Sequence, residues 1–286
     1  TNRLVEHRAV SLDVRPHSLL GHWAMDAILD GRIADTTGSG RDLRVEGEVA
    51  ILDGRFDQAV SLSAPSGYLA GGYDPALQPV RSVSVAAWIR AEDLTGPEKQ
   101  FLVHNAFRMS WLEKGYMLWA ADGRINWWVK TEPGGSMDTA WVSTAAEAGR
   151  WIHVTATYDG TRASLYLDAQ LQASVPAGGD IQWGPAPYRG LHVGAGWDDL
   201  SFSTFAGAID DVRIYDYALS EEEIRCLYDG LAADFDEDWR IGPQDLRLWM
   251  PYWLAADPPG RYDFNHDRRI DLTDLAFLAE RWGTRF

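Results

Sequence analysis

Cysteine is almost absent from this sequence of 286 residues. Cys226 is its single cysteine, so no disulfide can form within the chain. It lies in EEEIRCLYDG, on the apolar side of an expected helix, which favours the role of a small buried hydrophobic residue. Stability must then come from an apolar core, for which a hydrophobic content of 46% is sufficient.

Basic residues are also few. Lys and Arg number 26 against 42 Asp and Glu, which gives a formal net charge of −16. Binding to nucleic acid requires basic groups that neutralise phosphates, so this balance argues against nucleic acid and anionic membranes as partners. It suits a secreted protein that holds cations.

Long apolar runs are missing as well. No hydrophobic stretch approaches the length needed to cross a bilayer, so membrane insertion is not expected. The sequence begins at Thr1 rather than at Met, and we expect that a signal peptide has been removed. The expected location is therefore extracellular or at the cell surface.

Alternating apolar residues dominate the chain up to residue 230. In an N-terminal arm (1–16), Val10, Leu12 and Val14 alternate with polar residues, which predicts a half-buried strand. From 17 to 230, strand-like runs are separated by Gly, Asp and Pro, and Asp-Gly pairs predict tight hairpins. The clearest runs are SVSVAAWIRA, YMLWAADGRINWWVK, RWIHVTATYDGTRASLYLDAQ, LHVGAGW and IDDVRIYDY. This pattern predicts a mainly-β, two-sheet antiparallel sandwich, closed by one helix between Ser220 and Gly230.

Residues 231–286 have a different period. DLRLWMPYWL and DLAFLAERW place apolar residues at helical spacing, so short amphipathic helices are expected, the first of them kinked or shortened at Pro251. An acidic pattern precedes each helix and occurs twice, 29 residues apart. The first copy consists of Asp234, Asp236, Asp238 and Asp245, and the second of Asp263, Asn265, Asp267 and Asp274.

These offsets are positions 1, 3, 5 and 12 of an EF-hand-type calcium loop. Ca²⁺ binds six to eight oxygen ligands, and position 7 supplies its backbone carbonyl, so Arg240 and Arg269 are acceptable there. The sequence thus predicts two calcium ions in this module. The alternative is two acidic surface turns at the starts of helices, where carboxylates also favour the helix dipole.

Two loops, each followed by a helix and lacking an entering helix, resemble the dockerin module over about 55 residues. That resemblance implies a fold built around two calcium ions and, in the best-known members, a cohesin partner. Cohesin recognition often uses Ser-Thr pairs at positions 10 and 11. Here those positions are Pro243-Gln244 and Leu272-Thr273, which argues against a cohesin partner.

The region 17–230 resembles the laminin-G-like branch of the concanavalin-type jelly rolls. The resemblance rests on GHWAMDAILDGRIADTTGSGRDL, SVSVAAWIRA, GRWIHVTATYDGTRASLYLDAQ and the closing phrase FAGAIDDVRIYDYALSEEEIRCLYDG. It implies a lectin-like or adhesive jelly-roll sandwich, or an accessory module of a glycan-degrading enzyme. It also implies a third calcium ion between Asp26 and Asp210, unless these two residues only end strands.

Catalysis is not expected. Retaining glycoside hydrolysis requires two carboxylates close together on one face, and laminarinase-type hydrolases of this fold carry them on one strand as Glu-x-Asp-x-x-Glu. No such run occurs in the strand-like segments, and neither does a Ser-His-Asp signature or a Gly-rich phosphate loop. His104, His153 and His192 lie within apolar strands and are expected to be structural.

Tryptophan is abundant, with 14 residues, and allows two interpretations. Trp23, Trp88, Trp128 and Trp151 are expected in the core, whereas Trp111, Trp141, Trp183 and Trp197 are expected in loops. Sugars present C–H faces to aromatic rings and hydroxyls to carboxylates, so Trp183, Trp197 and Asp198 could form a glycan site. Alternatively, these tryptophans seal the ends of the sandwich against solvent.

The sequence therefore favours a secreted, calcium-binding, non-enzymatic protein for adhesion, glycan binding or extracellular assembly. The expected partner is a glycan or another protein subunit. The alternative is a structural subunit of a surface layer or filament, in which the arm adds as a strand to a neighbouring molecule. An accessory module of a carbohydrate-active enzyme ranks third.

Overall fold

The computed structural model describes residues 18–63, 65–109, 112–132, 139–185, 190–198, 201–229, 241–254, 262, 269–280 and 282. The arm (1–16), Trp111, and the predicted calcium ligands Asp234, Asp236, Asp238, Arg240, Asp263, Asn265 and Asp267 lie outside the described residues.

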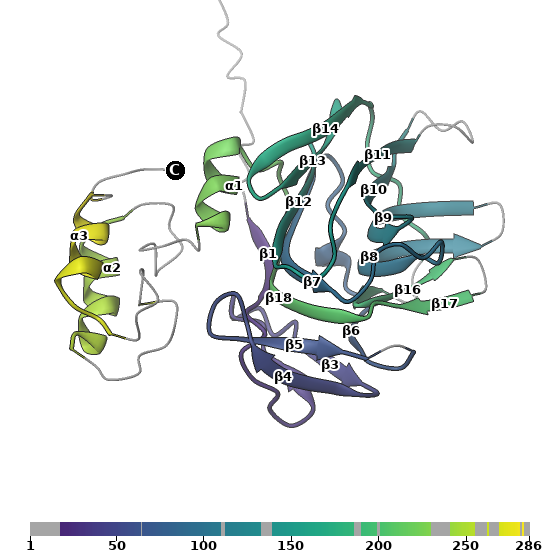
Figure 1. Cartoon of the computed structure of the whole chain (residues 1–286). Coiled ribbons are helices and arrows are strands. Elements are labelled where there is room, and N and C mark those ends of the chain that lie inside the picture. The colour runs from purple at the N-terminus through teal and green to yellow at the C-terminus, as the bar shows by residue number, and fades with distance from the viewer. Residues whose placement is uncertain are drawn as a thin grey trace, which may run out of the picture.

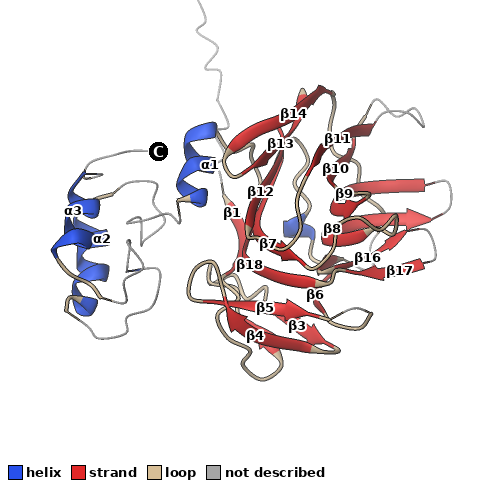
Figure 2. Ribbon diagram, in the orientation of Figure 1, coloured by secondary structure: helices blue, strands red, loops and turns tan. Residues whose placement is uncertain are grey.

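Two antiparallel eight-stranded sheets form the sandwich (Figures 1 and 2). The first sheet has the order β14-β13-β12-β7-β18-β5-β4, with β1 also paired to β18. Its strands are β1 (Leu19–Trp23), β4 (Val49–Asp53), β5 (Gln58–Leu62), β7 (Val83–Ala91), β12 (Ile152–Tyr158), β13 (Arg162–Leu167), β14 (Gln170–Pro176) and β18 (Gly207–Tyr215).

The second sheet has the order β11-β10-β9-β8-β15-β6-β3-β2. Its strands are β2 (Arg32–Ile33), β3 (Leu43–Glu46), β6 (Tyr68–Gly72), β8 (Gln100–Met109), β9 (Leu112–Ala121), β10 (Arg124–Lys130), β11 (Thr139–Ala145) and β15 (Leu191–Val193). A separate hairpin consists of β16 (Ala195–Asp198) and β17 (Ser201–Thr204), and a 3₁₀ helix, η1, spans Pro75–Leu77.

The predicted Asp-Gly hairpin between β9 and β10 is confirmed. Asp122 and Gly123 both have positive φ, 51° and 70°, which matches the twist that a two-residue hairpin turn requires. The turn sets the register, in which Ala121 pairs with Arg124. Every residue of β10 is thereby assigned to one side of the sheet.

The main core lies between the sheets and takes one side of each strand. Trp23, Val85, Leu118, Trp127 and Val154 are among its buried members. Trp88 and Trp128 are buried, as expected for core residues, but they lie outside the cluster between the sheets. Both face outward, on the first and the second sheet respectively.

Helix α1 (Glu221–Tyr228) covers the outer side of the first sheet. It begins as the sequence predicts, because Ser220 accepts from the Glu223 amide while the Glu223 carboxylate accepts from the Ser220 amide. Ile224 and Leu227 pack on outward-facing residues such as Tyr215, and Tyr228 stacks on Trp88 with ring centroids 5.4 Å apart. This outer face is therefore occupied by the protein itself.

The C-terminal repeat forms helices α2 (Pro243–Trp249) and α3 (Leu272–Glu280), which lie side by side in Figure 1. Helix α2 ends before Pro251, and the 3₁₀ helix η2 (Met250–Tyr252) continues the chain, as the proline predicts. Ile241, Trp249, Ile270 and Leu278 form a separate small core. Within the described residues, no helix is both long and apolar enough to cross a bilayer.

Candidate ligand-binding face and cation sites

One row of side chains crosses the outer side of the second sheet. Register pairs run from His192 on β15 to His104 on β8 and then to Met117 on β9. The same row continues through Trp128 on β10 to Trp141 on the edge strand β11. We use the name aromatic face for the outer side of the second sheet at β9, β10 and β11.

Trp141 is the exposed member of the aromatic face. Its exposed fraction is 59%, and its Nε1–H donates to Oδ1 of the buried Asn126 at 3.2 Å. Its ring lies against Trp119, with centroids 6.0 Å apart. These contacts fix the indole while leaving much of its surface open to solvent. The expectation that Trp141 lies in a loop is wrong, because pairing with β10 makes it part of a strand.

Two cationic side chains border these rings. The Lys99 ammonium lies 5.3 Å from the centre of the Trp119 ring. Arg124 donates from Nε to the Ser143 hydroxyl and from Nη2 to the Ser143 carbonyl, both at 3.0 Å. Ser143 is two residues from Trp141 on the same side of β11, so the Arg124 guanidinium is held beside the exposed ring.

The sequence analysis missed Asn126, Trp119 and Lys99 as site residues. The hairpin register could have found the first two, because a two-residue turn at 122–123 pairs Trp119 with Asn126 on one face. Lys99 precedes β8, and its position over Trp119 depends on a loop that no local pattern specifies.

Trp197 lies in the hairpin β16–β17, on the outer side of the second sheet. Its ring packs edge-on against His192, with centroids 4.8 Å apart, and at a tilt against Phe202, with centroids 4.6 Å apart. Phe202 has an exposed fraction of 38% and also touches Tyr68, with centroids 5.0 Å apart. Asp198 is the last residue of β16. Trp197 is thus half-buried within an aromatic cluster.

Trp183 lies on the opposite side of the same sheet. Its Nε1–H donates to the Pro79 carbonyl at 3.0 Å, and its ring meets the core residue Tyr116 edge-on at 5.7 Å. The structure therefore does not bring Trp183 and Trp197 together. The contacts of Trp183 match the alternative interpretation, in which it seals the core.

Asp210 is a buried carboxylate on β18. Its Oδ2 accepts from the amides of Arg55 at 2.8 Å and Phe56 at 3.1 Å, whereas Oδ1 has no hydrogen-bond partner among the described residues. Gly54 permits this close approach, since a Cβ there would lie 2.7 Å from Asp210 Oδ2. Burial, followed by the negative charges of Asp211 and Asp26, raises the pKa of Asp210 to about 8.

Asp26, in the segment that follows β1, contacts the end of the same loop. The Gln58 amide donates to Asp26 Oδ1 at 3.2 Å, so the segment 54–58 contacts both carboxylates implied by the resemblance. A buried oxygen without a donor and a second acid nearby suit a cation, which would replace the missing positive charge. The donor set therefore fits calcium.

Asp211, next along β18, is neutralised within the protein. It has a positive φ of 48° at a β-bulge, which turns it away from the direction of Asp210. His22 Nε2 donates to its Oδ1 at 2.7 Å, and Arg213 Nε donates to it at 3.2 Å. Burial opposes ionisation, but Arg213 and His22 overcome it and hold the pKa of Asp211 far below its usual range.

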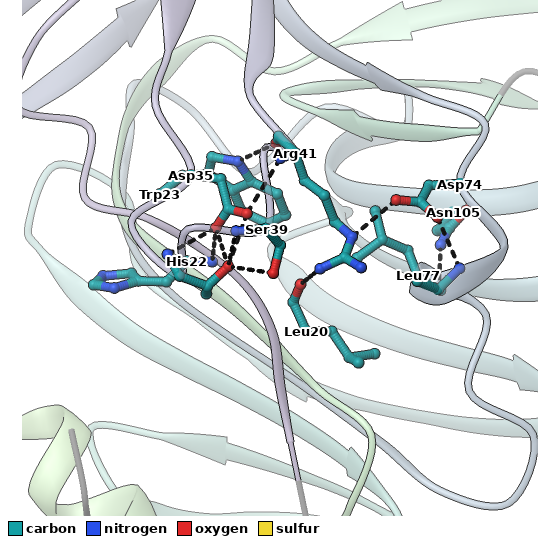
Figure 3. Close-up of polar contacts among 11 residues, drawn as sticks. Leu20, His22, Trp23, Asp35, Ser39, Arg41, Asp74, Leu77 and Asn105 are labelled. Atoms are coloured by element: carbon teal, nitrogen blue, oxygen red, sulfur yellow. Dashed lines mark hydrogen bonds and ion pairs between the residues drawn. The ribbon is translucent and has the colours of Figure 1, made fainter.

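Asp35 organises the acidic loop that follows β2 (Figure 3). Its carboxylate accepts from the amides of His22, Thr37 and Arg41 and from the Thr37 hydroxyl. Arg41 extends from this loop and donates to Asp74 at 2.8 Å and to the Leu20 carbonyl at 2.8 Å. Because protein donors occupy the Asp35 oxygens, this acid stabilises the loop and is not a candidate ligand for a cation.

The two position-12 acids of the C-terminal repeat are equivalent in the structure. Both Asp245 and Asp274 are buried. Asp245 Oδ2 accepts from the Gly242 amide at 2.7 Å, and Asp274 Oδ2 accepts from the Asp271 amide at 2.9 Å. A buried carboxylate at position 12 of each loop is compatible with a calcium loop, and the same kind of hydrogen bond caps the helix that follows the first loop. Arg269, at position 7 of the second loop, has an exposed side chain.

Within the described residues, no group of three or more His, Cys, Asp or Glu side chains is gathered as a metal site. In the C-terminal repeat, positions 1, 3 and 5 of both loops lie outside the part of the chain that the structure describes.

Residues 61–225 match the family described as the concanavalin A-like lectin/glucanases superfamily. This chain belongs to that superfamily. A 157-residue stretch is 29% identical to the pentraxin-related protein PTX3 of Mus musculus, covering 51% of this chain and 38% of that protein.

Solved structures share a similar fold at low identity. The binding domain of Paraclostridial Mosquitocidal Protein 1 is 18% identical with a TM-score of 0.56, and the match covers 74% of this chain and 52% of that one. Domain 4 of an extracellular arabinanase from Geobacillus stearothermophilus, in complex with arabinotriose, is 22% identical with a TM-score of 0.55. That match covers 74% of this chain and 98% of the arabinanase domain. The chain spans about half or less of the mouse and toxin relatives and nearly all of the arabinanase domain.

Proposed function

We propose that this protein is an extracellular, non-catalytic module that binds glycans on the aromatic face. The observation that carries this proposal is Trp141, an exposed indole held in place by Asn126 and Trp119. A fixed aromatic ring loses little conformational entropy when a sugar stacks on it, so it is a prepared surface for an apolar C–H face. The arabinotriose complex of the similar arabinanase domain supports a carbohydrate ligand for this fold.

Substitution of Trp141 tests the proposal. Trp141→Ala should weaken binding to any glycan that the protein retains on an array by at least about tenfold, which corresponds to about 1.4 kcal/mol. Trp141→Phe should keep part of the affinity because a ring remains. Trp282→Ala is the matched control, since Trp282 is also exposed but belongs to the C-terminal repeat. Equal glycan binding by Trp141→Ala and Trp282→Ala would exclude this site.

Calcium has a supporting role in the proposal. We place one ion at Asp210 and Asp26 and one in each C-terminal loop, at the sets that end in Asp245 and Asp274. An ion at Asp210 would fix loop 54–58, which that carboxylate already contacts through two amides. Isothermal titration of EDTA-treated protein with Ca²⁺ should give three sites, and Asp210→Asn should remove one of them.

Absence of hydrolysis is part of the same proposal. The similar solved structures include toxin binding domains and an arabinanase domain, which supports binding rather than catalysis. Sustained release of reducing sugar, abolished by replacing one carboxylate, would overturn it. A binding module of this kind serves either adhesion or the targeting of a carbohydrate-active enzyme, and the near-complete coverage of the arabinanase domain favours the second use.

Assembly through strand addition is the second candidate function. Among the described strands, β1 pairs only with β18. Its other edge is occupied by the protein, because Asp35, Thr36 and Arg41 bind the amide and carbonyl groups of Leu20 and His22 there. The outermost described strands of the two sheets are β14, β4, β11 and β2, and an arm from a neighbouring molecule could add to one of these edges.

A further inference from the structure

The charge distribution on the aromatic face differs from that of the whole protein. The chain has a net charge of −16. No Asp or Glu occupies the outward positions of β9 (115–121), β10 (124–130) or β11 (139–145). These positions do include Arg124 and Lys130. This part of an acid-rich protein therefore has no carboxylate at the outward positions around Trp141, and the next position of the same alternation on β9 is Glu113.

Cationic groups lie on the same face as the exposed ring. Arg124 is held beside Trp141 through Ser143, as described above. Lys130 pairs with Thr139, and both lie on the same side as Trp141, one outward position further along the strands. Lys99 lies over Trp119, whose ring contacts that of Trp141. An indole bordered by positive charge accepts the apolar face of a sugar and an anionic substituent of the same or the next sugar.

We propose that the aromatic face selects acidic glycans, namely polysaccharides whose sugar rings carry carboxylate or sulfate groups. This inference rests on the proposed glycan-binding function and specifies its ligand class. A guanidinium recognises a carboxylate or a sulfate through paired hydrogen bonds, and the adjacent indole supplies contact area that a simple counterion site lacks.

Paired polysaccharides test this selectivity. Polygalacturonate is compared with its methyl ester, and carrageenan with agarose, so that each pair differs mainly in charge. The intact protein should bind the charged member at least about tenfold more tightly at about 50 mM salt, and the preference should shrink at about 500 mM salt because ions screen the contact. Preference within only one pair supports the proposal and identifies carboxylate or sulfate as the recognised group.

Variants locate the selectivity. The double variant Arg124→Gln with Lys99→Gln should lose most of the preference for the charged member yet retain binding to the neutral one, whereas Trp141→Ala should weaken both. Circular dichroism confirms that each variant is folded. Binding by the intact protein in EDTA is a further control, because bound calcium can bridge two anions. The preference should persist without calcium, and its loss would assign recognition to a cation site and overturn the proposal.

The outcomes distinguish the two proposals. Equal binding of charged and neutral members, still dependent on Trp141, would overturn the acidic selectivity and leave the glycan-binding function standing. A preference that survives in the double variant would place the acidic contact elsewhere and overturn this assignment. No binding to any of the four polysaccharides or to a wider glycan array would contradict both.

Discussion

Replacing Asp210 with asparagine should stabilise the calcium-free sandwich increasingly as the pH rises. The folded protein holds the pKa of Asp210 at about 8, against a usual value of 3.8. Folding therefore favours the protonated acid. Below about pH 4 the Asp210 carboxyl does not lower the free energy of unfolding. As the pH rises towards 8, the free energy of unfolding of the wild type falls progressively.

The size of the effect follows from the shift. Each pH unit between the two pKa values costs the wild-type protein about 1.4 kcal/mol of unfolding free energy. Between about pH 5.5 and about pH 7.5, the wild type should lose roughly 2–3 kcal/mol more than Asp210→Asn, because asparagine does not titrate. The side-chain oxygen of the asparagine in this variant can still accept from the two amides of loop 54–58.

Chemical denaturation in EDTA at both pH values, followed by tryptophan fluorescence, measures this double difference. Other titrating groups cancel to first order, including His153, whose pKa burial lowers to about 4. Added Ca²⁺ should restore the wild type and have a smaller effect on Asp210→Asn. Equal pH slopes for the two proteins in EDTA would refute the reasoning about this buried acid.

The remaining predictions concern the two ends of the chain. EDTA should melt the C-terminal repeat while sparing most of the sandwich, because the small core around Trp249 and Ile270 is insufficient alone; identical calorimetric traces with and without EDTA would count against calcium in the loops. Asp274→Asn should lower the Ca²⁺ affinity of the second loop at least about tenfold, since a metal ligand loses its charge, whereas Asp93→Asn, an exposed acid of the sandwich, should leave Ca²⁺ titrations unchanged. Deleting residues 1–15 should convert any oligomer to monomers if arms add to neighbouring sheets. Burial of Val10, Leu12 and Val14 would contribute roughly 1.5–3 kcal/mol each to such an oligomer. If light scattering shows a monomer both before and after the deletion, the arm has no role in assembly.

The strands could be read from the sequence because local rules specify them. β7 is a β-branched, apolar run, and β9 and β10 flank an Asp-Gly turn whose positive φ values the pair readily adopts. Helix α1 was predicted for the same kind of reason, since Ser220 and Glu223 satisfy each other's backbone donors. Each of these elements depends on residues close in sequence.

The side of the sheet on which each side chain lies could not be predicted from the sequence in the same way. Trp127 and Trp128 are adjacent and both buried, so a run that is apolar on both sides gives no sign of which residue enters the core. Trp183 and Trp197 are both close to glycine, yet they lie on opposite sides of one sheet. Their positions depend on long-range pairing of strands, which short-range periodicity does not encode.

The candidate cation ligands come from the sequence, and the bound calcium ions stay a prediction. The repeat of 29 residues identified Asp245 and Asp274, which the structure buries in equivalent settings, and the closing phrase of the sandwich identified Asp210. The opposite pKa shifts of Asp210 and Asp211 could not be foreseen, because a bulge with positive φ directs the two neighbours into different surroundings. The sequence alone shows only two consecutive acids.

Because α1 covers the first sheet, it also limits how many polysaccharide chains one molecule can bind. With Ile224, Leu227 and Tyr228 packed on that sheet, the proposed contact with a ligand is confined to the edge of the second sheet at Trp141, because Trp119 and Trp128 are themselves buried. A single sandwich is then univalent towards polysaccharide and lies along one strand of it without joining two. Cross-linking of a glycan matrix would require paired molecules or a second binding element, so the helix makes network formation depend on protein concentration.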